Sequence, residues 1–154
     1  MSIKVMLADD HVLMREGIRQ LLEFDGTISV IAEANNGVEC MEQLLSVHPD
    51  ILLLDINMPV MNGIEVLQEI KKKNISVKVL VLTVHNEVEY LLKAVDIGID
   101  GYIINFIDIT PRFLPVFAEK FSFEYLRKSH KIPLFSNKLV TDYIRSLTLA
   151  CTAA

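Results

Sequence analysis

Three apolar runs in the sequence end in oxygen-bearing side chains that could do chemistry. These side chains are Asp9 and Asp10 after VMLA, Asp55 at the end of ILLLD, and Thr83 at the end of KVLVLT. Short runs of this kind, rich in leucine and β-branched residues, predict buried β-strands. In an open α/β sheet a ligand binds beyond the carboxyl ends of the strands, so these four residues are the first candidates for a functional site.

Carboxylates that meet at one sheet edge repel one another strongly unless a cation lies among them. A lone aspartate is commonly a turn residue or a helix cap, but that explanation is weak for Asp9, Asp10 and Asp55 together. We interpret the cluster as having no His or Cys beside it. A small set of hard oxygen ligands then predicts Mg²⁺ rather than zinc.

A carboxylate can attack phosphorus when a divalent cation offsets its charge and that of the incoming phosphoryl group. The hydroxyl of Thr83 would lie at the same edge and could meet a phosphoryl oxygen. Taken alone, Thr83 is more often an ordinary strand residue. The combination predicts a phosphoryl-transfer site.

The elements that must position these residues alternate between two periods. Strands are expected at 3–8, 28–34, 50–55, 78–83 and 101–104. Between them, apolar residues recur at helical spacing in four sets: Val12, Ile18, Leu21 and Leu22; Val38, Met41, Leu44 and Leu45; Ile64, Leu67 and Ile70; Val88, Leu91, Leu92 and Val95. Gly37 and Gly63 are expected just before helices. This alternation predicts an α/β fold with a parallel sheet and helices on both faces.

Composition excludes several classes of protein. With 154 residues and 51% hydrophobic side chains, the chain can bury a core. Its net charge of −5 argues against a free-standing basic nucleic-acid binder. We find no apolar run of membrane length and no secretory signal. Two lone cysteines, Cys40 and Cys151, suggest reduced thiols in a cytoplasmic protein.

With these motifs in place, the sequence resembles the receiver domain of two-component response regulators. The resemblance covers residues 2–104 and rests on VMLADDH, LLLDINMPVMNGIEVL and VLTVHNEVEYLLKAVDIGIDGY. It is closest to the branch that carries a LuxR-like helix-turn-helix output domain. The family implies a receiver core over residues 1–104 with a flavodoxin-like, doubly wound, five-stranded parallel sheet in the order 2-1-3-4-5.

The resemblance also implies a role for each site residue. Asp55 would accept a phosphoryl group from a sensor histidine kinase. Asp10 and Asp55 would ligate Mg²⁺, with Asp9 acting directly or through water and the backbone carbonyl of Asn57 completing the protein ligands. Upon phosphorylation Thr83 would swing toward the phosphoryl group and Tyr102 would change rotamer. An alternative for Tyr102 is a strand-end aromatic that packs the sheet edge.

One family residue is missing. The family motif Gly-Tyr-x-x-Lys reads Gly-Tyr-Ile-Ile-Asn here, so Asn105 replaces the lysine. The site is then one charge more negative before any phosphoryl group arrives. A hydrogen bond to a charged group contributes about 1.5–3 kcal/mol and a neutral one about 0.5–1.5 kcal/mol. We therefore expect the link between phosphorylation and conformation to weaken by about 1–2 kcal/mol, or roughly tenfold in active population, while chemistry at Asp55 remains possible.

Beyond the missing lysine the composition changes. All six glycines lie at or before residue 101, and five of the seven phenylalanines fall within 106–123. We expect residues 105–134 to form an atypical Phe-rich segment in place of the fifth helix. Residues 135–154 resemble a linker helix, and no output domain follows in this sequence. A reading-frame disturbance over 104–134, true divergence and a separate interaction surface each explain the change. Translating the coding DNA in the other two frames tests the first.

Three functions compete. The leading one is a phosphorylated receiver that forms a homodimer through its fourth helix and fifth strand and contacts DNA only through an output domain outside this sequence. The second is a Mg²⁺-dependent aspartyl phosphatase, which is disfavoured because Asn57 stands where an acid/base residue would be needed. The third is an atypical receiver that acts as an interaction module without phosphorylation.

Overall fold

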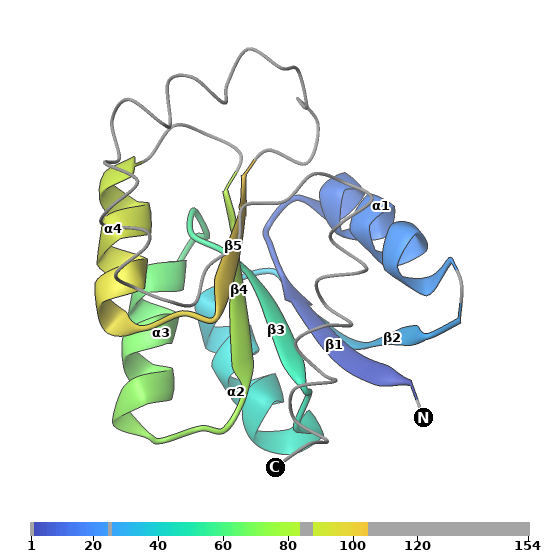
Figure 1. Ribbon diagram of the computed structural model, residues 1–154, viewed down its shortest axis with the longest axis horizontal. Helices are drawn as coiled ribbons and strands as arrows, with labels where there is room; N and C mark the ends of the chain where they lie inside the picture. The colour runs from blue at the N-terminus through green and yellow to red at the C-terminus, as the bar shows by residue number, and fades with distance from the viewer. Residues whose placement is uncertain (1, 25, 84–87, 105–154) are drawn as a thin grey trace.

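The computed structural model describes residues 2–24, 26–83 and 88–104. Five parallel strands form one sheet in the order β2-β1-β3-β4-β5 (Figure 1). They are β1 (Ile3–Ala8), β2 (Ile28–Ala34), β3 (Ile51–Asp55), β4 (Lys78–Thr83) and β5 (Gly101–Ile104). The predicted fold class and strand order are confirmed. The segments expected at 105–134 and 135–154 lie outside the described residues.

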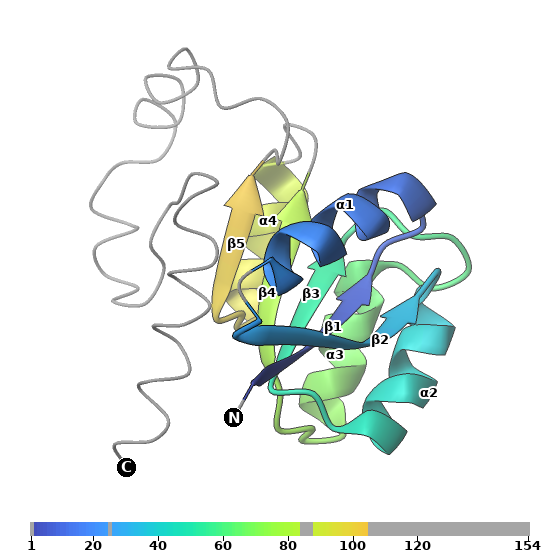
Figure 2. The same cartoon turned by 90° about the vertical axis from the view of Figure 1, so that its right-hand side faces the viewer.

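Helices cover both faces of this sheet. They are α1 (Val12–Glu23), α2 (Gly37–Val47), α3 (Gly63–Lys72) and α4 (Val88–Ile97). Among the described elements, α1 packs on one face, while α2, α3 and α4 pack on the other (Figure 2). None of the helices in the described part of the chain is long and apolar enough to cross a membrane.

The continuous apolar strands follow from this arrangement, because each strand must bury side chains on both faces. In β1, Val5 and Leu7 join the cluster that contains Ile18 and Leu22 of α1. Met6 and Ala8, which alternate with them in β1, join the opposite cluster under α2, α3 and α4. Cys40 belongs to that second cluster, and burial raises the pKa of its thiol to about 12.

Several of the apolar residues that recur at helical spacing are exposed. These residues are Val12, Leu21, Val38, Leu45 and Leu92. A helix packed on a sheet buries only one stripe of its surface, so apolar residues that flank the stripe remain in solvent. The apolar spacing therefore located the four helices, and the structure shows which of these residues are buried.

Two asparagines, rather than the following glycines, mark where α2 and α3 begin. The Asn36 side chain accepts a hydrogen bond from the backbone N–H of Glu39 at 3.0 Å. Asn62 accepts one from the backbone N–H of Glu65, and the Glu65 carboxylate accepts the backbone N–H of Asn62 in return. Gly37 and Gly63 were expected to precede the helices, but each is the first residue of its helix. The asparagine side chains satisfy N–H groups that the helix itself leaves unpaired.

Both glycines let a helix begin directly against the loop that follows β3. A Cβ atom on Gly63 would lie 2.3 Å from the carbonyl oxygen of Asp55. One on Gly37 would lie 2.4 Å from the carbonyl oxygen of Met61, which accepts the Gly37 N–H at 3.0 Å. Any larger residue would push the helix away from the backbone that carries Asp55.

We expect Gly63→Ala to lower the free energy of unfolding by about 1–3 kcal/mol, because its methyl group collides with backbone atoms that cannot move aside. Gly17→Ala is a matched control, since nothing lies within 4 Å of a Cβ at this helical position. That change should raise stability by up to about 1 kcal/mol. Urea denaturation measures both, and equal effects of the two substitutions would contradict the close approach at Gly63.

Candidate functional site

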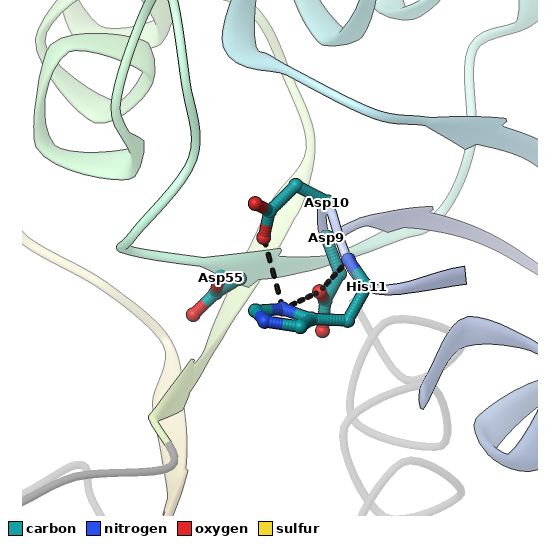
Figure 3. Close-up of side chains that lie close together, drawn as sticks. All are labelled: Asp9, Asp10, His11 and Asp55. Carbon is teal, nitrogen blue, oxygen red and sulfur yellow. Dashed lines mark hydrogen bonds and ion pairs between the residues drawn. The ribbon is translucent and has the colours of Figure 1, made fainter. Parts of the chain in front are cut away.

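The parallel register brings the three predicted carboxylates to one edge of the sheet. Ala8 of β1 is in register with Leu54 of β3, so the residues that follow each of them, Asp9 and Asp55, emerge side by side. Asp10 comes next in the chain. Ligand atoms from these three aspartates and from His11 all lie within 4.8 Å of one another (Figure 3). The predicted cluster therefore forms, with one member that was not predicted.

Asp55 is the most strongly perturbed of the three carboxylates. Its side chain is buried, and burial together with the nearby charge of Asp9 raises its pKa from 3.8 to about 6. Hydrogen bonds from the backbone N–H groups of Asn57 and Ile56 oppose this shift, because they stabilise the ionised form. Asp55 is thus a carboxylate whose negative charge is costly in the folded protein.

Asp9 and Asp10 differ in their surroundings. Asp9 is 3% exposed, and its Oδ1 accepts the backbone N–H of His11 at 2.7 Å. The Asp10 side chain is one-third exposed, but its Oδ1 is buried, and the His11 imidazole is its partner there, with Nδ1 2.9 Å away. Both aspartates therefore place a carboxylate oxygen next to the same imidazole.

His11 is the functional candidate that sequence reasoning missed. Its Nδ1 lies 3.1 Å from Asp9 Oδ1 and 2.9 Å from Asp10 Oδ1 (Figure 3). The hydrogen bond with Asp9 and the charge of Asp10 raise the pKa of its imidazole. The interpretation that no His or Cys lies beside the cluster is therefore wrong. The signal was present in the sequence, since His11 follows Asp10 directly.

A buried arginine holds the backbone at the acidic edge, the end of the sheet that carries Asp9, Asp10 and Asp55. The Arg15 guanidinium, on α1, donates a hydrogen bond to the backbone carbonyl of Asp9. Its Nε also donates to Glu33 of β2 at 3.2 Å, and Arg19 pairs with the same carboxylate. Because this network ties α1 and β2 to the end of β1, Asp9 cannot move outward to relieve the repulsion. Nothing in the apolar periodicity of α1 pointed to a buried charge at position 15.

The remaining predicted residues lie on neighbouring elements. Thr83 is the last residue of β4, one position after Leu82, which is in register with Asp55. Tyr102 lies in β5, in register with Val81, and its side chain is buried in the core, which raises the pKa of its phenol. Asn57 follows β3 in the loop toward α3. Asn105 lies outside the described residues.

The donor set of this cluster fits a divalent metal ion. Three carboxylates from two strand ends supply oxygen ligands that lie within 4.8 Å of one another. Hard oxygen donors of this kind suit Mg²⁺, whereas the added imidazole nitrogen is a ligand that transition ions accept. The acidic edge is therefore a site that could hold a metal.

In metal-free buffer we expect Asp55→Asn to stabilise the protein in a pH-dependent way. The pKa of Asp55 is about 6 in the folded protein and 3.8 in the unfolded chain. Between these two pH values the folded protein therefore keeps a proton on Asp55 that the unfolded chain has lost. The associated stability is present below about pH 4 and lost as pH rises through about 6. Asp55→Asn should thus raise the free energy of unfolding by about 2–3 kcal/mol at about pH 8 and change it little near pH 4.

Asp96→Asn, on an exposed position of α4, controls for the loss of one negative charge. Denaturation in EDTA at the two pH values measures the effect. If Asp55→Asn raises the free energy of unfolding equally at both pH values, Asp55 is not the carboxylate whose pKa the fold raises.

Comparison with known proteins places the chain in a family. The family model for the response regulator receiver domain matches residues 5–109. The nitrate/nitrite response regulator NarL of Escherichia coli K12 is 39% identical over 110 residues, which are 71% of this chain and 50% of NarL. NarP, a nitrate/nitrite response regulator of the same organism, is 34% identical over 142 residues, which are 92% of this chain and 61% of NarP.

A solved structure of a LuxR-family two-component response regulator from Aurantimonas sp. SI85-9A1 is similar as well. It matches with a TM-score of 0.66 and 28% identity, over 86% of this chain and 90% of that chain. The chain spans about half the length of NarL. The relatives are regulators of the NarL and LuxR type, as the resemblance in sequence predicted. This chain therefore belongs to the response regulator receiver domain family.

Proposed function

We propose that this chain is a phosphorylated receiver that takes a phosphoryl group on Asp55 from a sensor histidine kinase. The observation that carries the proposal is the buried Asp55 carboxylate at the sheet edge, within reach of Asp9 and Asp10. Such a carboxylate can act as a nucleophile toward phosphorus when a divalent cation offsets its charge and that of the incoming phosphoryl group. Membership of the receiver family supports the same role.

The residues present suit a bound Mg²⁺ ion. Asp10 and Asp55 would ligate it, Asp9 would act directly or through water, and the backbone carbonyl of Asn57 would complete the set. When bound, Mg²⁺ supplies positive charge that offsets both the carboxylates and the incoming phosphoryl group. Arg15 contributes by holding the Asp9 backbone, so that the oxygen ligands stay together.

In the phosphoryl transfer, the main task of the protein is to orient the Asp55 carboxylate toward the phosphorus atom. A carboxylate oxygen of Asp55 attacks phosphorus, the P–N bond of the kinase phosphohistidine breaks, and the released imidazole nitrogen takes up a proton from water. The backbone N–H groups of Ile56 and Asn57 already donate toward this carboxylate and hold it in orientation. Asp55 is therefore the nucleophile, and its neighbours orient it.

Thr83 and Tyr102 would transmit the state of Asp55 across the sheet. Thr83 ends the strand adjacent to β3, so a shift of its backbone toward the phosphoryl group would move the end of β4. Tyr102, on the next strand, would repack in step with it. Because Tyr102 is buried in the core, its movement would change the packing around α4 and β5.

Partners and context follow from the family and stay within this proposal. We infer a cytoplasmic protein that forms a homodimer through α4 and β5, acts in transcription regulation, and would contact DNA only through an output domain outside this sequence. A phosphatase that turns over many substrates is disfavoured, because Asn57 offers no acid or base two residues after Asp55. The replacement of the family lysine by Asn105 favours one alternative, an atypical receiver that binds partners without phosphorylation.

Incubation with Mg²⁺ and a small phosphodonor such as acetyl phosphate tests the proposal. We expect the native chain to take up stable label and Asp55→Ala to take up at least about tenfold less, because the nucleophile is gone. Asp96→Ala, on the exposed part of α4, should label normally. Rapid multi-turnover phosphate release would point to a phosphatase, and absence of label from the native chain would favour the interaction module.

Restoring the family lysine should strengthen the response. We expect Asn105→Lys to raise the active fraction of the phosphorylated or beryllofluoride-bound protein roughly tenfold, because a charged hydrogen bond replaces a neutral one. The active fraction is read from the amide NMR shifts of Thr83 and Tyr102. Asn105→Gln is the neutral control. An equal response from the Lys and Gln variants would show that the missing charge is not what limits switching.

A further inference from the structure

The His11 side chain lies in the acidic cluster, although its position at the start of α1 would suit a helix-capping role. It is the N-cap residue of α1, yet its side chain makes no capping hydrogen bond. Ser, Thr, Asp or Asn at such a position would stabilise the helix by about 1 kcal/mol more. Instead the imidazole turns toward the carboxylates, with Nδ1 near Asp9 Oδ1 and Asp10 Oδ1 (Figure 3). The side chain is therefore directed toward the site rather than the helix.

The geometry allows the imidazole to become a metal ligand. Two ligands on one ion with bonds of ~2.1 Å lie about 3–4 Å apart. Ligand atoms of Asp9, Asp10, His11 and Asp55 are all within 4.8 Å of one another, so closing around an ion needs shifts of about an ångström per atom. The His11 side chain is 69% exposed, so no packing resists this rearrangement.

An imidazole nitrogen changes which ion the site prefers. Mg²⁺ favours oxygen ligands and gains little from a nitrogen donor, whereas borderline ions such as Co²⁺ and Zn²⁺ bind imidazole well. We propose that this site also takes a borderline divalent transition ion, with His11 as a nitrogen ligand beside the three aspartates. The inference rests on the metal site of the proposed function and adds the fourth ligand and the class of ion.

In the metal-free protein Nδ1 contacts the same two carboxylates that would bind the ion. With an ion bound, Asp9 and Asp10 would hold it through their oxygens in place of the contact with the imidazole, and His11 would supply a ring nitrogen. The Arg15 hydrogen bond to the Asp9 carbonyl keeps the main chain in place during this exchange. The exposed His11 side chain would reorient, and the carboxylate oxygens would shift by about an ångström.

Calorimetric titration of the full chain with MgCl₂ and with CoCl₂ at about pH 8, where a free imidazole is neutral, tests the inference. The test variant is His11→Asn, because asparagine is a favourable helix-cap residue and should not destabilise α1. We expect it to weaken Co²⁺ binding at least about tenfold, while Mg²⁺ binding changes less than about threefold. The visible absorption of bound Co²⁺ should change in the same variant, because a nitrogen ligand is lost.

His48→Asn is the matched control, since His48 is exposed at the end of α2 with a φ of 47°, a conformation that asparagine adopts readily. It should bind both ions like the native chain. If Mg²⁺ binds and His11→Asn leaves Co²⁺ affinity and absorption unchanged, His11 is no ligand and this inference is overturned alone. If neither ion binds the native chain, the metal site of the proposed function falls with it.

Discussion

The repulsion among three carboxylates at one sheet edge is the constraint on which the rest of the site depends. Parallel pairing fixes where β1 and β3 end, and thus sets Asp9 beside Asp55. Gly63 admits the start of α3 against the Asp55 carbonyl, and Arg15 anchors the Asp9 carbonyl. Each of these contacts prevents the carboxylates from separating. The fold therefore maintains an electrostatically unfavourable arrangement that a cation can relieve.

This arrangement also accounts for how a local event could spread. The loop after β3 is bound to α2 through the Gly37 N–H and to α3 through the Asn62 cap, so it is rigid on that side. On the other side lie β4 and β5. Thr83 is the last residue of β4, and the buried Tyr102 lies within β5. If the loop does not move when Asp55 is phosphorylated, the conformational change would have to involve β4 and β5. The proposed switch follows this asymmetry.

Much of the fold was predictable because strand ends and apolar periodicity are local signals. All five strands and the three carboxylates were located from the sequence, to within one residue at the start of β3. What failed depended on side-chain direction, which periodicity does not encode. His11 could have been a helix cap facing away, and Arg15 could have been a solvent-facing charge. Only the packed structure shows both turned toward Asp9.

The dependence of stability on Mg²⁺ tests the central claim most directly. If a cation relieves the repulsion, the free energy of unfolding at about pH 8 should rise by about 1.4 kcal/mol for each tenfold increase in Mg²⁺ above its dissociation constant. NaCl at matched ionic strength should produce little of this gain, since it only screens charge. Unfolding curves that coincide in EDTA and in saturating Mg²⁺ would contradict the account.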